Sequence, residues 1–291
     1  MIEATQNTRK SAVNLKIGGM ALENGVLFQT EKYWAMAIRD ESEGIKISSG
    51  EKARIAHNSR ARRIPLLRGL VSLAETAMVV PSAHYHGGRL PLPTHSPRVL
   101  ASMIVSVLGT IIVRNPKRRL PPLVEELAAS ALALVPALVA LRKTDAIEYH
   151  AAEHKSINAW ESSGVIDKDK AELATAEHPR CGSNIMGPAL GMMTIGNTLA
   201  RRWLGTRRGN YARLGVGILS LSGAIEMVQW ASRNPNSFFS KALTLPGGEL
   251  QHLVTTAEPT HQQLEVGLAA LQELLRLEGA LEKSPDVSQA G

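Results

Sequence analysis

The residues best suited to chemistry lie near the middle of the chain, in the run YHAAEH that starts at Tyr149. His150 and His154 are one helical turn apart, and Glu153 is three residues from His150, so a helix would project all three side chains to one side. Two such imidazoles can chelate a divalent ion, and an adjacent carboxylate can be the general base that activates water. The spacing H-x-x-E-H is that of inverzincin metalloproteases, although a pattern with so few fixed positions is common by chance.

A second pair of ligand types, His178 and Cys181, follows with the spacing H-x-x-C. Thiolate and imidazole both suit zinc, so His150, His154, His178 and Cys181 together predict a zinc site. Four protein ligands would make a closed structural site, whereas three would leave a position for water and make a catalytic one. The alternative is a surface helix with two solvated histidines and a cysteine buried beside the next apolar run.

Glu226 stands inside an apolar run, where a carboxylate is costly unless it is paired or coordinates an ion. It is therefore a further candidate metal ligand. In inverzincins a downstream glutamate completes the metal site, and Glu226 could have the same role. Pairing with a buried arginine explains Glu226 equally well. The sequence has no P-loop, dinucleotide or G-x-S-x-G fingerprint that would indicate other chemistry.

Helix signals surround these residues and indicate how they would be positioned. Asp145 and Glu148 fit a capping box at the start of the histidine helix, and Gly164 is a stop signal. Thr260 and Gln263 fit a second capping box, which is followed by leucines at helical spacing. Both patterns predict ordinary helices, and the second one is expected to dock onto the rest of the protein.

The N-terminal part is rich in charge and shows mixed patterns. Residues 36–38 and 44–47 predict a short β-hairpin. A helix is expected over 64–80, started by Pro65, and a loop or linker over 81–97.

Four runs with at most one charge dominate the rest of the chain: Val99–Val113, Leu127–Leu141, Cys181–Ala200 and Leu214–Ala231. Each is marginal alone, because a membrane span needs about 20 mostly apolar residues. The runs are rich in Gly, Ala and Ser, and basic clusters lie at 114–119 and 201–208. Both features favour two spanning hairpins over the core helices of a soluble bundle.

The membrane orientation stays open at this point. The positive-inside rule would place the two short basic loops in the cytoplasm. However, the segment 54–68 is itself basic, and the N-terminus carries no export signal.

The composition is that of a folded chain with an excess of positive charge. Of 291 residues, 44 % are hydrophobic and 20 % charged, and the net charge is +7. Such a charge favours acidic partners such as anionic lipid or nucleic acid. Nucleic acid is disfavoured, because no helix-turn-helix cue or RNA-binding signature is present. The one cysteine excludes an internal disulfide framework and any zinc ribbon with several cysteines.

These motifs together resemble the YqhQ-like family of bacterial and plastid membrane proteins, catalogued as domain of unknown function 1385. The matching blocks begin at Ile17, Ile64, Glu148, His178 and Glu226, and continue through Pro246, Gln251, Thr255 and Glu265. Asn158 and Glu161 belong to the central block. The flanking blocks depart from the family pattern at Met20, Asn24, Gln29 and Ala257, whereas the histidine motif is intact. The resemblance implies a multi-span membrane protein, described as a predicted metal-dependent enzyme whose reaction is unassigned.

The sequence therefore predicts a mainly α protein with a small β element near the N-terminus and about four spanning or buried helices in two hairpins. Its expected organisation is a soluble α+β region (1–97), a first hairpin (98–142), a polar loop and helix with the metal motif (143–182), a second hairpin (183–232), a C-terminal segment with a docked helix (233–282) and a disordered tail (283–291).

The predicted function is that of a zinc-dependent protein of the cell membrane, with a cytoplasmic soluble protein as the alternative location. Its expected partners are the lipid bilayer and an unidentified substrate or protein. In the first interpretation it is a hydrolase, with His150 and His154 as ligands, His178, Cys181 or Glu226 completing the site, and Glu153 as the general base. In the alternative, the same ligands form a structural zinc site in a non-enzymatic binding or assembly factor.

Overall fold

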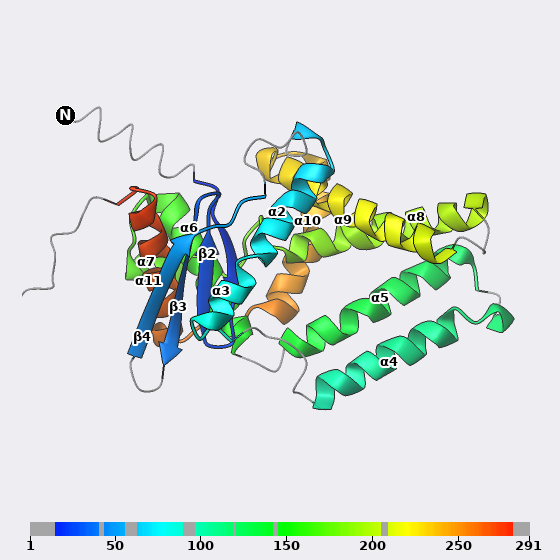
Figure 1. The fold of residues 1–291 in the computed structure, drawn as a ribbon, viewed down its shortest axis with the longest axis horizontal. Coiled ribbons are helices and arrows are strands. Elements are labelled where there is room, and N and C mark those ends of the chain that lie inside the picture. The colour runs from blue at the N-terminus through cyan, green and yellow to red at the C-terminus, as the bar shows by residue number, and fades with distance from the viewer. Residues whose placement is uncertain are drawn as a thin grey trace, which may run out of the picture.

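The computed structural model describes residues 15–40, 44–55, 63–89, 97–118, 120–141, 145–204 and 209–281. It has two unlike parts, which we call the sheet unit and the helical array (Figure 1). The sheet unit holds the four strands with the helices that cover them, and the helical array holds the long apolar helices. The predicted tail at 283–291 and the basic residues Arg119, Arg207 and Arg208 lie outside the described residues.

The sheet is an antiparallel meander with the order β1-β2-β3-β4. Its strands are β1 (Gly18–Ala21), β2 (Gly25–Gln29), β3 (Tyr33–Asp40) and β4 (Gly44–Glu51). Pairing of Ala37 with Ile47 confirms the predicted hairpin, and β1 and β2 extend it. The sequence did not predict β2, because this strand is buried on both faces and lacks the alternation of a half-exposed strand.

One face of the sheet is covered by two helices, α6 (Ala146–Ser163) and α11 (His261–Leu277). Val26 and Phe28 of β2 pack there against buried leucines of α11. The two helices approach closely at Gly267, where a Cβ atom would collide with Ser156 and with the backbone of Ala152. This close packing fixes α6, the helix that carries the histidine motif, against the sheet unit.

The caps of these two helices differ from each other. Thr260 and Gln263 form the predicted capping box of α11. The box predicted at Asp145 is wrong, since its side chain makes no capping bond and Glu148 instead accepts a hydrogen bond from Gln263 Nε2 at 2.6 Å. The predicted end of α6 is confirmed at Gly164, which adopts the left-handed conformation with φ 68°.

The opposite face of the sheet is covered by α2 (Leu67–Ala77) and α3 (Val80–Tyr85). The helix predicted over 64–80 is found in part, as α2, and the loop predicted over 81–97 is replaced by α3 as far as Tyr85. Residues 90–96 of that loop lie outside the described residues. The chain breaks after Ala77 and restarts with Pro81 in the first turn of α3, a position where proline is well tolerated. A short helix, α7 (Lys168–Leu173), lies beside α6 and α11.

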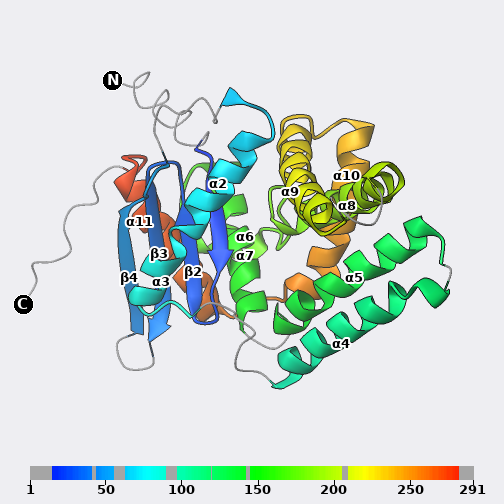
Figure 2. The same cartoon turned by 45° about the vertical axis from the view of Figure 1, so that its right-hand side comes forward.

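The helical array contains two hairpins and a crossing helix (Figure 2). The hairpins are α4 (Pro97–Val113) with α5 (Pro122–Leu141), and α8 (Ser183–Leu204) with α9 (Gly209–Arg233). The hairpins meet where α5 packs against α8, and both tips point away from the sheet unit (Figure 1). Exposed basic residues at these tips include Lys117, Arg118 and Arg202. The crossing helix α10 (Phe238–Leu250), which the sequence did not predict, packs on α8 and α9 and ends in a π-helical turn, Gln251–Thr255.

In the helical array, small polar side chains point inward and large apolar side chains point outward. In α4, the serines at 102 and 106 are buried, and Ser106 donates to the carbonyl of Leu132 in α5 at 2.7 Å. The large apolar side chains of the same helix are exposed instead: Leu100, Met103, Ile104, Val105, Val107, Leu108, Ile111 and Ile112. A helix that packs its apolar side inward in water has the opposite arrangement.

One helix of the described residues is long and apolar enough to cross a membrane: the stretch Leu214–Arg233 of α9. Only 39 % of that stretch is buried inside the protein, less than expected for the core helix of a globular domain. α4 is a shorter apolar helix. The prediction of a mainly α protein with a small β element is therefore confirmed. The sequence also predicted about four spanning or buried helices. Among the described helices, length and hydropathy support a membrane span for one, α9.

Candidate metal centre

Three of the predicted ligands, His150, His154 and Cys181, meet in one cluster. One donor atom from each lies within 4.8 Å of the others. His150 Nε2 is 3.2 Å from Cys181 Sγ, and the two imidazole rings are 4.3 Å apart between centroids. The histidines come from successive turns of α6, and the loop that leads into α8 brings the thiol back to them.

Backbone carbonyls orient both imidazoles of the cluster. His150 Nδ1 is 2.8 Å from the carbonyl of Thr255, and His154 Nδ1 is 2.6 Å from the carbonyl of Ala176. Because a carbonyl only accepts, each Nδ1 is the protonated nitrogen, and the lone pair is left on Nε2. Metal-binding histidines are held in the same way by a bond to the other ring nitrogen.

The donor set of this cluster fits zinc. His154 Nε2 is buried and has no hydrogen-bond partner among the described residues, as expected for an atom that binds an ion. Imidazole nitrogens with a thiolate are donors that zinc prefers, and three protein ligands leave a fourth position open.

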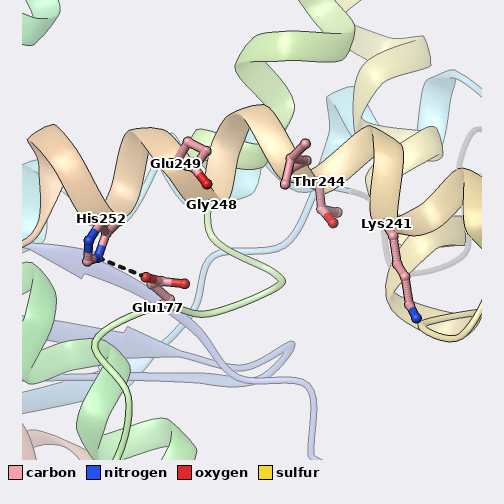
Figure 3. Close-up of a pocket in the computed structure, with 7 residues that line it drawn as sticks. Glu177, Lys241, Thr244, Gly248, Glu249 and His252 are labelled. Atoms are coloured by element: carbon pink, nitrogen blue, oxygen red, sulfur yellow. Dashed lines mark ion pairs between the residues drawn. The ribbon is translucent and has the colours of Figure 1, made fainter.

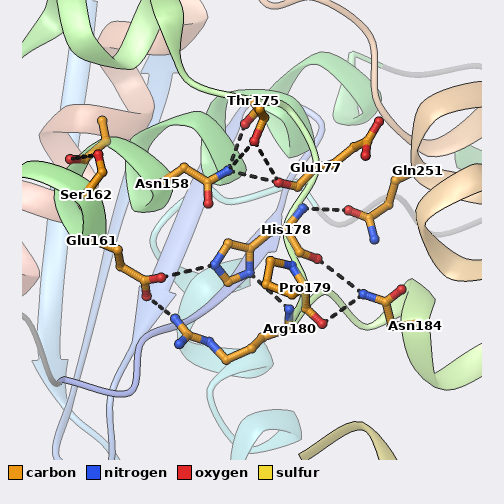
Figure 4. A network of polar contacts seen from close by, with 11 residues as sticks. Asn158, Glu161, Ser162, Thr175, Glu177, His178, Pro179, Arg180, Asn184 and Gln251 are labelled. Carbon is orange, nitrogen blue, oxygen red and sulfur yellow. Dashed lines mark hydrogen bonds and ion pairs between the residues drawn. The ribbon is translucent and has the colours of Figure 1, made fainter. Parts of the chain in front are cut away.

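His178 lies beside the cluster and faces a different partner. Its ring is 5.7 Å from that of His154 between centroids, but Nε2 faces Glu161 Oε2 at 3.5 Å. Its Nδ1 accepts from the backbone nitrogen of Arg180 at 3.3 Å. Burial lowers the pKa of His178, and the interaction of its ring with the Glu161 carboxylate, which accepts from it, offsets part of that effect. In Figure 4 the ring of His178 points at Glu161, which also binds Arg180.

The loop over 175–181 is held by side chains that the chemical motifs did not single out (Figure 4). Asn158 Nδ2 donates to the carbonyls of Thr175 and Glu177, at 2.8 and 2.9 Å. Gln251 Oε1 accepts from the backbone nitrogen of His178 at 2.9 Å, and Asn184 Nδ2 donates to the carbonyl of Pro179 at the same length. Asn158, Gln251 and Thr255 belong to the blocks that resemble the known family, and this resemblance is the only sequence signal that marks them. A sequence motif does not show what a side chain contacts.

The π-helical turn Gln251–Thr255 links α10 to the cluster. It supplies the Gln251 side chain to the loop and the Thr255 carbonyl to His150. Such turns are rare in helices and are frequent at functional sites.

Glu153 lies next to the cluster on α6 but outside the group of three. Its carboxylate packs against β1 at Gly19, where a Cβ atom would overlap it. Burial raises the pKa of Glu153 to about 7, and the electrostatic effect of the neighbouring His150 ring partly opposes that shift. Glu153 is therefore a buried carboxylate that can hold a proton near neutral pH.

Glu226 is engaged away from the cluster, in α9. Its two oxygens bind the guanidinium of Arg68, with Nε to Oε1 at 2.6 Å, and Oε1 also accepts from the backbone nitrogen of Leu66 at 3.3 Å. This is the arginine pairing that the sequence left open as an alternative, although the Arg68 side chain is 39 % exposed rather than buried. The pair attaches the start of α2 to α9.

A pocket of about 470 Å³ lies along α10, beside the loop that carries Glu177 (Figure 3). Lys241, Thr244 and His252 line it, and His252 Nδ1 is 3.3 Å from Glu177 Oε1. Both members of this pair are more than half exposed. The ion pair therefore contributes little to stability, and it does not extend the cluster of His150, His154 and Cys181.

Comparison with known proteins gives a family without an assigned reaction. A family model described as "Protein of unknown function (DUF1385)" matches residues 93–277, well over half of the chain. The "Uncharacterized protein YqhQ" of Bacillus subtilis (strain 168) is 24 % identical over 308 aligned positions, covering 92 % of this chain and 94 % of that protein. No solved structure matches the chain significantly.

Proposed function

This chain belongs to the DUF1385 family of proteins of unknown function, and from that premise we propose that it is a membrane-embedded zinc-dependent hydrolase. The observation that carries the proposal is the group of His150, His154 and Cys181, with both imidazoles oriented by carbonyls. Three donors leave the fourth position that a catalytic zinc site needs.

The inverted side-chain pattern of the helical array supports a position in the bilayer. Lipid requires apolar groups on the outside and favours small or hydroxyl-bearing residues between helices, as in α4. At about 1.5 Å per residue, the 25 residues of α9 exceed the roughly 30 Å of a hydrocarbon core. Exposed tryptophans lie toward opposite ends of the α8–α9 hairpin, Trp203 at the tip and Trp230 near the sheet unit, as in interfacial aromatic belts. We therefore place both hairpins across the membrane.

The proposed chemistry assigns a distinct role to each group. Zinc in this position would act as a Lewis acid and lower the pKa of water. His150, His154 and Cys181 would hold the ion, and the carbonyls of Thr255 and Ala176 would keep the imidazoles in the binding tautomer. Glu153, buried on the same helix, would accept the proton released by the attacking water.

A closed structural site is the second candidate, and the position of His178 favours it. This buried ring lies 5.7 Å from that of His154, so a rotation away from Glu161 would bring a fourth donor toward the ion. The protein would then be a membrane-anchored binding or assembly factor rather than an enzyme.

Zinc content tests the site itself. Purified full-length protein in detergent should contain about one zinc per chain, and His154→Ala should lose it. The matched control is His252→Ala, which removes an exposed histidine outside the cluster and should leave the zinc content unchanged. Full zinc in His154→Ala would refute the ligand assignment.

His178→Ala separates the two candidate functions. A three-ligand site should keep its zinc in this variant, with an unchanged X-ray absorption spectrum. A closed site should lose the ion or change its number of nitrogen ligands. Glu153→Gln should retain zinc in either case, and it should abolish turnover only if the site is catalytic.

A further inference from the structure

A cavity of about 800 Å³ lies between the sheet unit and the end of α9 nearest to it. Gln29 of β2, Arg68 and Ser72 of α2, and Ser232 and Arg233 of α9 are among the residues that line it. Glu161 and Arg180 form a further part of the wall. Because Glu161 also faces His178, the cavity begins one side chain away from the metal centre.

The lining carries more positive than negative charge. Its cations are Lys16, Lys52, Arg68, Arg180 and Arg233, and its acids are Glu31, Glu75 and Glu161. Arg180 binds Glu161 and Arg68 binds Glu226, so these two guanidinium groups are held in place by carboxylates. Arg233 has no carboxylate within ion-pair distance among the described residues. The guanidinium of Arg233 therefore suits phosphate, which such a group can bind with two parallel hydrogen bonds. Arg68 uses Nε and Nη2 on Glu226, so it would add a single hydrogen bond from Nη1.

Gln29 provides independent evidence for a ligand. The residue is 6 % exposed and lines the cavity. Its Oε1 atom is buried and has no hydrogen-bond donor among the described residues. Buried amides without a partner are rare, because the lost hydrogen bonds to water are not replaced. A ligand in the cavity would supply the missing partner, since an amide can present either oxygen or nitrogen to it.

The position of the cavity suggests where its ligand comes from. α9 carries exposed Leu214, Ile218 and Leu219 along its length, and its last turn contributes Gln229, Ser232 and Arg233 to the lining. Exposed Trp230, Phe238 and Phe239 lie at the same end of the helix. Aromatic residues of this kind gather where hydrocarbon meets headgroups. The mouth of the cavity would thus face the layer that holds lipid phosphates.

We propose that this cavity binds a phosphate-bearing anion, with the headgroup of an anionic membrane lipid as its source. Arg233 and Arg68 would bind the phosphate oxygens, and the Gln29 amide would bind an oxygen of the same group. This site is separate from the proposed zinc ligands and does not depend on the reaction that they carry out.

The test measures binding to the full-length, zinc-loaded protein in neutral detergent. The probes are phosphatidic acid, diacylglycerol as its match without phosphate, and inorganic phosphate. Phosphatidic acid should bind and raise the melting temperature, whereas diacylglycerol should not. Arg233→Gln should weaken the binding about tenfold, the usual cost of losing a charged hydrogen bond. The matched control Lys241→Gln removes the same charge from α10 outside the cavity, and should bind as the wild type does.

Gln29→Leu keeps the test decisive if Arg233→Gln does not fold. Leucine has a similar volume and removes the unpartnered amide, so the ligand-free protein should melt at the same or a higher temperature while binding weakens. Binding of inorganic phosphate with the same dependence on Arg233 and Gln29 would assign the site to soluble phosphate compounds and overturn the lipid source. An equal loss of phosphatidic acid binding in Arg233→Gln and Lys241→Gln would overturn the site. The same holds if neither phosphatidic acid nor inorganic phosphate binds. Zinc content should be that of the wild type in all variants, so a failure here is distinct from a failure of the zinc proposal.

Discussion

The sheet unit and the helical array place apolar side chains in opposite ways. In α11 of the sheet unit, Leu271 and Leu274 are fully buried against the strands. In α4 of the array, Leu100 and Leu108 are more than half exposed, and the serines at 102 and 106 are buried. Both helices have 17 residues, so length does not separate them. This difference is the one expected under the proposed function, with the array in the bilayer and the sheet unit outside it.

The two parts also treat buried carboxylates differently. Glu126 of α5 is fully buried, and its Oε2 accepts from Arg114 Nη2 at 2.9 Å. Glu153 of the sheet unit lies among apolar groups and the histidine cluster, where burial raises its pKa to about 7. Glu126 thus has a cation beside it, whereas burial makes Glu153 favour its protonated form. This contrast is expected if Glu153 serves chemistry and Glu126 serves packing.

The largest effect is expected from a truncation in the sheet unit. Leu271→Ala should lower the free energy of unfolding by about 2–5 kcal/mol, because it leaves a cavity in a close-packed core. The matched truncation Leu100→Ala, on the exposed face of α4, should change it by less than about 0.5 kcal/mol. Denaturation in neutral detergent, followed by circular dichroism, measures both. Similar losses in the two variants would contradict an outward apolar face on α4.

A charge placed on the array should have the next largest effect. Leu108→Lys near the middle of α4 should disfavour membrane insertion by about 3 kcal/mol. Ile47→Lys, at a similarly exposed position of β4, should be tolerated because the proposed function places β4 outside the membrane. The measurement is the fraction of each protein that stays in the membrane pellet after carbonate extraction. If Leu108→Lys were as well inserted as Ile47→Lys, the array would not lie in lipid.

Glu153 gives a pH dependence in the metal-free protein. Its pKa rises from 4.5 to about 7 on folding, so its stabilising contribution is fully present below pH 4.5 and is lost as the pH rises through 7. The shift corresponds to about 3 kcal/mol, before screening and relaxation reduce it. Glu153→Gln should therefore melt at a higher temperature than the wild type at pH 8, and at a similar temperature near pH 4.5.

The corresponding change in the array should have the opposite sign. Glu126→Gln removes the charge that pairs with Arg114, so this variant should melt lower than the wild type at pH 8. If Glu153→Gln also melted lower at pH 8 in metal-free protein, Glu153 would be a paired, structural carboxylate.

The smallest predicted effect compares two helix caps within the sheet unit. Thr260→Ala should lower the free energy of unfolding by about 1 kcal/mol, because the Thr260 side chain accepts a hydrogen bond from the backbone nitrogen of Gln263. Asp145→Ala should be close to neutral, since Asp145 makes no capping bond. Thermal denaturation of both variants checks this order. A larger loss in Asp145→Ala would mean that the box predicted from the sequence does form.

Local patterns predicted the long helices well. The apolar runs became α4, α5, α8 and α9, and the capping signal at Thr260 gave the start of α11. The pattern failed for α10, where Pro246 and two glycines stand inside a helix that packing against α8 and α9 maintains. It also failed for β2, whose two covered faces remove the alternation on which strand prediction depends.

The sequence predicted more candidate ligands than the cluster holds and could not choose among them. His150 and His154 were placed on one side of a helix by their spacing alone. The spacing of His178 and Cys181 made both of them equal candidates, yet Cys181 joins the cluster and His178 turns to Glu161. Glu226 was also a candidate, and Arg68, distant in sequence, pairs with it.

The amino-acid sequence by itself determined which chemical groups this protein can bring to a site, because residue types and helical periodicity are local properties. It contains the imidazoles, the thiol and the carboxylate, and it separates apolar runs from charged ones. Only the tertiary structure decided which donors meet, because that depends on contacts between distant segments. The carbonyl of Thr255 reaches His150 from a π-helical turn more than a hundred residues away, and Arg233 reaches the cavity beside β2 from the end of α9. Such contacts depend on how α6, α9 and α10 pack, and no local pattern of residues encodes that packing.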